Sequence, residues 1–235
     1  MSQKKVFIGL PCYDGWNPKF AVSLLSGLNG APPSILHTLD GDSLIPRARN
    51  NLAAELLESD ATHLLFLDTD LEFSREGLHR LMSHDLDVVG GVYFQKRHDR
   101  LIPVLNGRQG EQPDETGMMR VKHVGTGLMM ISRRVFEKLI ESGKVKRFYS
   151  CDDEAKQRWS YEFFPIGVGP DERYESEDWA FCRLAEEVGM EIWADWGMQA
   201  RHHGHGVYPC EPVEQMRQQL KDMKHLPQLQ EKGRR

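Results

Sequence analysis

The chain has 235 residues, of which 40% are hydrophobic and 28% are charged, and its formal net charge is −5. This length fits one α/β domain with a substantial core, and the composition is that of an ordinary globular protein. The net negative charge does not indicate nucleic-acid binding by the molecule as a whole, although a local basic face stays open. No apolar run in the sequence reaches the length of a membrane span.

The cysteines and the N-terminus indicate a cellular compartment. Cys12, Cys151, Cys182 and Cys210 lie far apart and form no C-x-x-C pair, so reduced thiols are the simplest interpretation. The N-terminus leads into a stretch of strand-like sequence that is too short for the apolar region of a signal peptide. The sequence therefore predicts a cytoplasmic protein.

Strands and helices alternate through the first 94 residues. Buried strands are predicted at 6–10, 34–39, 63–67 and 88–92, and helices at 20–28, 48–57 and 74–82. Pro11 is expected to end the first strand, and Ser43 and Ser74 are candidate caps of the second and third helices. This alternation favours an α/β fold with a Rossmann-like, mostly parallel central sheet flanked by helices.

The pattern changes after residue 94. Residues 95–116 are polar and rich in Gly and Pro, and they predict a long excursion from the sheet. Further strands are expected at 120–124, 128–131 and 191–194, and further helices at 133–140 and 176–188. Residues 201–208 form a loop rich in His and Gly. We expect a single catalytic domain over residues 1–210, followed by a polar C-terminal helix and tail at 211–235.

The most informative stretch is residues 64–70, which read Leu-Leu-Phe-Leu-Asp-Thr-Asp. The apolar run predicts a strand that is buried on both faces. Because side chains i and i+2 of a strand point to the same face, Asp68 and Asp70 are expected to converge where the strand leaves the sheet. Two buried carboxylates need a counter-charge, and Mn²⁺ or Mg²⁺ suits oxygen ligands and commonly brings a phosphate. The sequence therefore predicts a divalent-metal site at this edge.

Several elements in chain order resemble a GT-A-type glycosyltransferase. Around the Asp-x-Asp strand they are Arg47-Ala48-Arg49-Asn50, Gly90-Gly91-Val92-Tyr93, Val124-Gly125-Thr126-Gly127-Leu128-Met129-Met130-Ile131, Ser176-Glu177-Asp178 and His202-His203-Gly204. The chain is similar over residues 4–210 to small bacterial and phage glycosyltransferases, and more distantly to fungal Anp1-type mannosyltransferases. The resemblance implies a GT-A fold, a nucleotide-sugar donor and a Mn²⁺ or Mg²⁺ ion. The acceptor is not identified: a glycan, a protein, a lipid-linked glycan and a modified nucleic-acid base all stay open.

The resemblance assigns the metal site to two carboxylates and one histidine. Asp70 is expected to coordinate the ion directly, and Asp68 to coordinate it or to reach the donor's ribose or a metal-bound water. In similar enzymes a histidine completes the site from the far end of the sheet, and His202 matches it best, ahead of His205 and then His203. The alternatives are that the carboxylates only cap the following turn and that the histidines form a solvent-facing turn.

Asp178 is the candidate general base for an inverting transfer, in which it takes the proton of the acceptor hydroxyl. A structural role competes with this one, because Glu177 and Asp178 follow Ser176 in the first turn of a predicted helix, where carboxylates stabilise the helix dipole. In a retaining enzyme Asp178 would bind substrate instead. The sequence does not separate the two stereochemical outcomes.

Arg49 and Asn50 are candidate donor-binding residues, because they match best the helix that lines the nucleotide pocket in the family. Arginine suits bidentate contact with a phosphate or a base edge, and a cation in the first turn of a helix is otherwise unexpected. Tyr93, Lys96 and Arg97 are further candidates for contact with a phosphate or the acceptor, with Lys96 and Arg97 expected on a flexible rim.

Four smaller assignments complete the donor site. Pro11 and Tyr13 end the first strand, where the family packs the nucleoside base. Asp40 is expected to contact the base or the ribose, and Gly127 to let the backbone pass close to a ligand. Core packing is the commoner role for an aromatic residue at a strand end such as Tyr13. Ordinary turns explain Asp40 and Gly127 equally well.

Two other functions stay open. Haloacid-dehalogenase-like phosphatases also end a strand with Asp-x-Asp, but their nucleophile strand is normally the first, whereas here it is the third and Leu71-Glu72 follows. A non-catalytic sugar-nucleotide-binding module would keep the metal site and lose the base, and the presence of Asp178 argues mildly against it.

Overall fold

The computed structural model describes residues 4–97, 99–150, 158–204 and 207–208. The predicted C-terminal helix and tail at 211–235, and with them Cys151, His205 and Cys210, lie outside these residues. Within the described part of the chain, no helix combines the length and the apolar character that crossing a membrane requires. Cys12 and Cys182 are buried free thiols, and burial raises the pKa of Cys182 to about 12.

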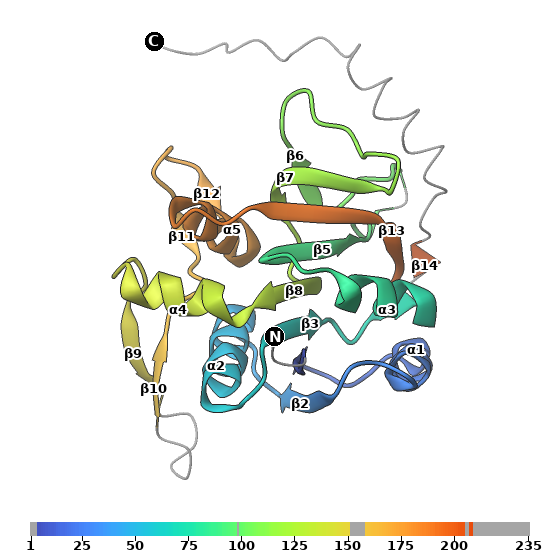
Figure 1. The fold of residues 1–235 in the computed structure, drawn as a ribbon, viewed down its shortest axis with the longest axis horizontal. Helices are drawn as coiled ribbons and strands as arrows, with labels where there is room; N and C mark the ends of the chain where they lie inside the picture. The colour runs from blue at the N-terminus through green and yellow to red at the C-terminus, as the bar shows by residue number, and fades with distance from the viewer. Residues whose placement is uncertain (1–3, 98, 151–157, 205–206, 209–235) are drawn as a thin grey trace.

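One large mixed sheet forms the centre of the fold (Figure 1). Its strands are β1 (Val6–Cys12), β2 (Ser34–Asp40), β3 (His63–Leu67), β5 (Val88–Val92), β6 (Leu105–Gly107), β7 (Met118–Val124), β8 (Leu128–Ser132) and β13 (Ile192–His203), in the order β2-β1-β3-β8-β5-β13-β7-β6. Two short strands, β4 (Leu71–Phe73) and β14 (Val207–Tyr208), pair with the end of β13. Only β7 and β8 run against the other strands of that order, so the predicted α/β fold with a mostly parallel strand direction is confirmed.

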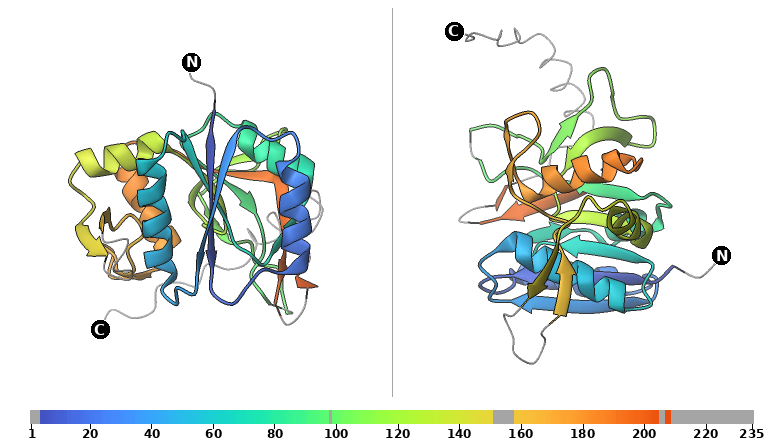
Figure 2. Two further views of the ribbon diagram at one scale, coloured as in Figure 1. Left: turned by 90° about the horizontal axis from the view of Figure 1, so that it is seen from below. Right: turned by 90° about the vertical axis from the view of Figure 1, so that its left-hand side faces the viewer.

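Helices cover both faces of the sheet (Figure 2). On one face lie α1 (Pro18–Leu28) and α3 (Arg75–Ser83), and on the other lie α2 (Ile45–Glu58), α4 (Arg133–Glu141) and α5 (Glu177–Glu187). Two small hairpins stand beside the second set of helices: β9 (Arg147–Ser150) with β10 (Arg158–Tyr161), and β11 (Gly167–Val168) with β12 (Tyr174–Glu175).

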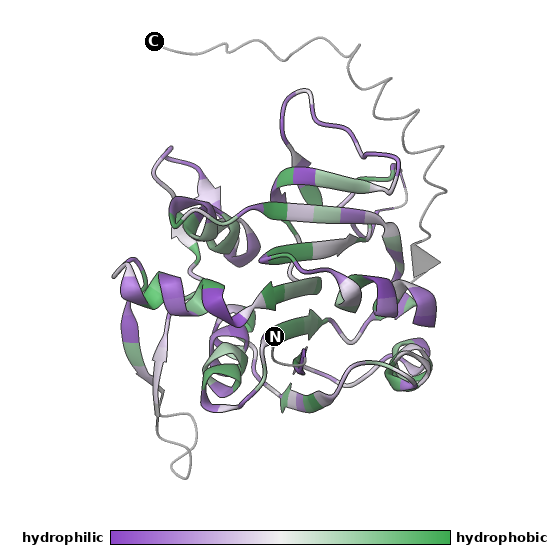
Figure 3. Ribbon diagram, in the orientation of Figure 1, coloured by the Kyte–Doolittle hydropathy of each residue, from purple (hydrophilic) through white to green (hydrophobic). Residues whose placement is uncertain are grey.

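Strand β3 connects the two hydrophobic cores. Leu64 and Phe66 pack into the core under α2, α4 and α5, while Leu65 and Leu67 pack into the core under α1 and α3. Figure 3 shows β3 and its neighbour β8 as hydrophobic along their length. Each fully buried side chain of this size contributes roughly 1.5–3 kcal/mol, so the strand is fixed in register up to the residue where Asp68 leaves the sheet.

Two predicted boundaries near the site are wrong. β1 continues through Pro11 to Cys12, because β3 pairs with it only as far as Gly9 and a residue without an N–H is tolerated where the ladder on one side has ended. Helix α2 begins at Ile45 with Leu44 as its N-cap, not at Ser43, and no side chain caps it. The Asp42 side chain instead accepts from the Leu44 amide at 2.9 Å and pairs with Arg47.

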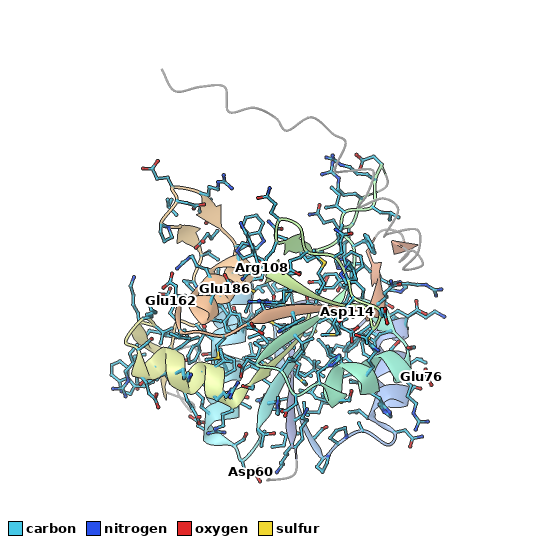
Figure 4. All side chains as sticks on the ribbon, turned by 45° about the horizontal axis from the view of Figure 1, so that its top comes forward. Asp60, Glu76, Arg108, Asp114, Glu162 and Glu186 are labelled. Carbon is cyan, nitrogen blue, oxygen red and sulfur yellow. The ribbon has the colours of Figure 1, made fainter. Side chains whose placement is uncertain are left out.

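The predicted His-rich loop at 201–208 is also corrected. β13 runs on to His203, because β4 pairs with it at Ala200–His202 and β14 pairs with His202 and His203. The register of β13 against β5 shifts between Asp195 and Gln199, which bends the strand toward β4. The excursion at 95–116 contains β6, and the ion pair of Arg108 with Glu186 ties it to α5 (Figure 4).

Candidate functional site

A cleft of about 920 Å³ lies at the carboxyl ends of β1 and β3. Segments distant in the chain line it: the end of β1 and the residues after it (Pro11 and Tyr13 to Asn17), the start of α2 (Ile45 and Arg49), the loop after β3 (Asp68 to Asp70), Lys96, the start of α5 (Glu177), and the last residue of β13 with the one after it (His203 and Gly204). This is the edge of an α/β sheet at which ligands usually bind. The cleft therefore brings together Pro11, Tyr13, Arg49, Asp68 and Asp70 from the predicted site.

Arg49 forms the buried wall of the cleft. Its side chain is only 3% exposed, its Nη2 donates to Asp68 Oδ1 at 2.9 Å, and its Nε lies 3.6 Å from Glu177 Oε1. Burial lowers the pKa of Arg49, but Asp68 and Glu177 outweigh it and the net pKa is raised, so the guanidinium stays charged. Its Nε and Nη1 atoms have no hydrogen-bond partner among the described residues. A buried cation with spare donors is suited to hold an anionic or carbonyl group of a ligand.

Asp70 lies opposite, between Lys96 and His202. Its Oδ2 is 2.5 Å from Lys96 Nζ and 3.4 Å from His202 Nε2. Burial raises the pKa of Asp70, but the contacts with His202 and Lys96 outweigh it and hold the pKa below its usual value. The second oxygen, Oδ1, is buried and has no hydrogen-bond partner within the described ranges. An ionised carboxylate with an unpaired buried oxygen is costly unless a ligand or ion completes it.

The orientation of His202 favours a metal ligand. Its Nδ1 lies 2.8 Å from the carbonyl oxygen of Phe94, and since a carbonyl only accepts, Nδ1 carries the hydrogen. Nε2 then faces Asp70 Oδ2, and it is the nitrogen that a cation between the two groups would bind. Histidine ligands of metals commonly donate their other N–H to such a carbonyl.

The side chains near Asp70 offer oxygen and nitrogen donors of the kind that a divalent ion binds. Asp70 and His202 offer an oxygen and a nitrogen, and Asp68 has one oxygen that does not contact Arg49. In the part of the chain that the structure describes, no group of three or more His, Cys, Asp or Glu side chains is arranged so that it could hold a metal ion. Mg²⁺ and Mn²⁺ commonly bind through one or two protein ligands together with water and substrate phosphates.

Gly127 lies against the side chains of Asp68 and Tyr93. A Cβ atom at Gly127 would lie 2.5 Å from Asp68 Oδ2 and 2.8 Å from the Tyr93 hydroxyl, so a larger residue would displace both. The Gly127 amide donates to that hydroxyl at 3.1 Å, and the ring of Tyr93 packs edge-on against His202 with centroids 5.4 Å apart. Gly127 therefore supports the carboxylate and the histidine and does not itself line the cleft.

The two acidic residues at the start of α5 point differently. Glu177 lines the cleft, where Thr126 and Arg49 approach its Oε1 at 3.4 Å and 3.6 Å. The Asp178 carboxylate instead accepts from the hydroxyl of Ser176 and from the Trp179 amide, the latter at 2.9 Å. The structure brings the neighbour of the predicted base, and not Asp178, to the cleft wall.

Two donor-site candidates lie off the cleft. Asn50 is 4% exposed, and its Oδ1 accepts from the Phe164 amide at 3.0 Å while its carbonyl accepts from the Ser160 hydroxyl at 3.2 Å. Asn50 thus fastens residues 160–164 to α2. Asp40 is exposed at the end of β2, where it pairs in register with Cys12 and accepts from the Thr38 hydroxyl at 3.3 Å.

The structure adds three residues, Trp16, Asn17 and Thr69, to the lining of the cleft that the sequence did not single out. Thr69 donates its hydroxyl to the Gly15 carbonyl at 3.1 Å, and the Asn17 amide donates to the Thr69 carbonyl at 2.9 Å, so the segment after β1 is tied to the Asp-x-Asp loop. Trp16 is 38% exposed on that segment, beside the more exposed Tyr13. The sequence signal that could have identified Trp16 is an aromatic residue beside a glycine, Gly15, shortly after a predicted buried strand.

The fold has known relatives among solved structures. No protein-family model and no curated protein matches this sequence. The structure is similar to A197 from STIV, with a TM-score of 0.54, 17% sequence identity and 86% of each chain covered. It is similar to GalNAc-T7 with UDP, GalNAc and Mn²⁺, with a TM-score of 0.53, 11% identity, and 85% of this chain but 43% of that chain covered. Identities this low show the fold alone, and the fold of this chain is the GT-A fold of glycosyltransferases.

Proposed function

We propose that this protein is a metal-dependent glycosyltransferase that transfers a sugar from a nucleoside-diphosphate sugar to an acceptor. The observation that carries the proposal is the contact of Asp70, which lines the cleft, with His202. Nε2 of His202 lies 3.4 Å from Asp70 Oδ2, and the other carboxylate oxygen, Oδ1, is buried without a hydrogen-bond partner among the described residues. The GT-A fold supports it, as does the presence of UDP and Mn²⁺ in the complex of GalNAc-T7. Kinship with small bacterial and phage enzymes, and with Anp1-type mannosyltransferases, stays a prediction.

In this reaction the bond between the anomeric carbon and the diphosphate oxygen breaks, and negative charge grows on the leaving group. A bound divalent ion would supply the neutralising charge, held by Asp70, His202 and the free oxygen of Asp68. Arg49 would direct its unpaired N–H groups at the donor from the buried wall. Tyr13 and Pro11 would contact the base.

The attacking hydroxyl of the acceptor needs a base. Asp178 is the base that the sequence predicts, but its carboxylate accepts from the Ser176 hydroxyl and the Trp179 amide and does not line the cleft. Glu177 already lines the cleft and is the second candidate. Its Oε1 lies 3.6 Å from Arg49 Nε.

Three other predicted donor-site residues would act on the donor indirectly. Gly127 supports Asp68, while Asn50 and Asp40 would act on the donor only through the segments they hold. The acceptor, the cytoplasmic location and the division into a catalytic domain at 1–210 and a tail at 211–235 stay predictions of the sequence.

Thermal unfolding with UDP- and GDP-sugars, each with and without Mn²⁺, tests the function. A ligand at about 100 times its Kd stabilises the native state by about 2.7 kcal/mol, which raises the Tm of a chain of this size by about 5–10 °C. We expect such a shift only with Mn²⁺, together with release of the nucleoside diphosphate. Asp70→Ala should lose both the shift and the release while its own Tm is unchanged or higher, since an unpaired buried oxygen is removed.

Asp87→Ala is the matched control, because Asp87 is a carboxylate at the opposite end of the sheet that is paired with Arg134. It should lower the Tm and keep the ligand shift. Normal release by Asp70→Ala in the presence of a chelator would refute the metal-dependent mechanism. A ligand shift without release from any donor would favour a non-catalytic binding module, and a trapped aspartyl-phosphate would favour a phosphatase.

A further inference from the structure

Lys96 occupies the position next to Asp70 at which a metal ion would have to bind. Its Nζ lies 2.5 Å from Asp70 Oδ2, the oxygen that also faces His202 Nε2. The side chains of Lys96 and Asp70 are 39% and 35% exposed, so water reaches the pair and the lysine can leave it. The ammonium group already supplies Asp70 with the positive charge that the carboxylate requires.

The charges of the residues that line the cleft can be balanced by one divalent ion. Among the described residues, Asp14, Asp68, Asp70 and Glu177 line it as acids, and Arg49 and Lys96 line it as strong bases. The ionised lining therefore has a net charge of −2, which equals the charge of one divalent cation. An ammonium group and a divalent ion on the same carboxylate oxygen would repel each other, so binding of the ion displaces Lys96.

We propose that Lys96 and the divalent ion are alternative partners of Asp70, and that the displaced Lys96 binds the diphosphate of the donor. The inference rests on the proposed metal site at Asp70. Lysine suits both partners, because its ammonium group is a compact point charge on a flexible stem and binds carboxylates and phosphates alike.

The backbone around Lys96 allows this exchange without disturbing His202. Phe94 bridges to Pro103, and the Gln95 amide donates to the Ile102 carbonyl at 2.9 Å, so the chain just before Lys96 is held on its far side. The Phe94 carbonyl that orients His202 belongs to this held segment. Only the lysine side chain has to turn, and the histidine ligand stays in place.

Lys96→Gln, which removes the charge and keeps most of the length, tests the exchange by direct binding. We expect it to bind Mn²⁺ alone about fivefold more tightly than the wild type, measured from the electron paramagnetic resonance signal of free Mn²⁺. With saturating Mn²⁺, the same variant should bind UDP about tenfold more weakly by calorimetry, or GDP where GDP gives the larger thermal shift. The opposite signs of the two changes are the signature of a lysine that changes partner.

Lys144→Gln is the matched control. Lys144 lies 2.8 Å from Glu187, with side-chain exposures of 38% and 34%, so its ion pair resembles that of Lys96 and Asp70 in burial but lies away from the cleft. It should change neither affinity. Lys96→Arg keeps the charge and should leave Mn²⁺ affinity close to that of the wild type.

The outcomes separate this inference from the proposed function. Equal Mn²⁺ affinity in the wild type and Lys96→Gln, with none in Asp70→Asn, would overturn the role of Lys96 and leave the metal site standing. Tighter Mn²⁺ binding with unchanged nucleotide affinity would overturn the transfer of Lys96 to the diphosphate. Absence of Mn²⁺ binding in every variant would overturn the proposed function itself.

Discussion

The two ends of β3 both open onto clefts lined by charged residues, but their polar groups are satisfied to different degrees. At the N-terminal end a cleft of about 380 Å³ is lined by His63, Asp87, Arg133 and neighbouring residues. There Asp87 accepts from Ser132 at 3.1 Å and pairs with Arg134. At the C-terminal end the larger cleft is lined by Asp70 and Arg49, whose Oδ1 and Nη1 atoms are buried and have no hydrogen-bond partner among the described residues. Between these two clefts, unpaired buried polar atoms distinguish the candidate site, whereas charged lining residues are common to both.

Two arginines show the difference most clearly. Arg133 donates through Nη1 and Nη2 to the carbonyls at the end of α2 and just after it, which are those of Leu56, Leu57, Ser59 and Ala61, at 2.6–3.2 Å. Arg49 donates one hydrogen bond, to Asp68. The first arginine closes a helix end and stabilises the fold. Arg49 has N–H groups without a hydrogen-bond partner among the described residues. Substitution of Arg49 should therefore mainly lower turnover, and substitution of Arg133 should mainly lower stability.

The largest effect is expected at the start of α5. Removing a general base costs about 10²–10⁴-fold in turnover, and only one of the two neighbouring acids can be that base. If Asp178 is the base, Asp178→Asn keeps its affinity for the donor and loses transfer activity. Glu177→Gln then retains most of the transfer activity. Single-turnover transfer to an accepted substrate, measured beside the thermal shift with donor, gives the assignment. Wild-type transfer by Asp178→Asn would remove Asp178 from the reaction.

The next effect separates Arg49 from Arg133. Arg49→Met should lower kcat/KM for the donor by about 10²–10³-fold, because it removes the buried donors and leaves Asp68 and Glu177 without their cation. Arg133→Met should instead lower the free energy of unfolding by about 2–4 kcal/mol, since several carbonyls lose their donor, and change kcat/KM by no more than about twofold. Urea unfolding and donor kinetics on both variants test the contrast. Equal loss of turnover in the two would remove the distinction between the ends.

A smaller effect distinguishes the two histidines at the end of β13. His202 Nε2 faces Asp70, whereas His203 Nε2 lies 2.9 Å from Glu72 Oε2 and is already paired. His202→Ala should therefore weaken Mn²⁺ binding by about 10–100-fold, and His203→Ala by less. The reverse order would assign the ligand to His203.

The sequence predicts the framework of the site well because the strands that carry it are short and apolar. The predicted ranges 63–67 and 88–92 coincide with β3 and β5, whose residues are buried on both faces. The Asp-x-Asp carboxylates then follow from strand geometry alone. Pairing between distant strands is not encoded in such local patterns, so the β4–β13 ladder that makes His202 a strand residue is not predicted.

The phase of the helices is the second limit of sequence-based prediction. Neighbouring residues on a helix differ by about 100° in direction, so only one of Arg49 and Asn50, and one of Glu177 and Asp178, can face the cleft. Residues 48–54 of α2 are all buried, so no polar face indicates its orientation. Contacts with residues 160–164 turn Asn50 away, and those contacts are visible only in the folded chain.

The smallest predicted effect concerns the N-terminal end and appears as a pH dependence of stability. Burial, with Lys4 adding to it, lowers the pKa of His63 to about 4, against about 6.5 in an unfolded chain. Above pH 6.5 both states are neutral and stability is unaffected. Between pH 6.5 and 4 the unfolded state binds the proton first, so the free energy of unfolding decreases as the pH decreases. The loss at pH 5 should be about 1–2 kcal/mol, since the adjoining cleft admits water.

His63→Gln should abolish this part of the acid sensitivity, because glutamine does not titrate. The measurement is the free energy of unfolding in urea at pH 7.5 and pH 5.0 for both proteins, which cancels any loss that the substitution causes at both pH values. The variant should show a drop between the two pH values that is smaller by about 1–2 kcal/mol. Because His63 lies at the opposite end of β3 from Asp70, donor turnover at pH 7.5 should stay at the wild-type rate. An equal drop in the two proteins would mean that folding does not lower the pKa of His63.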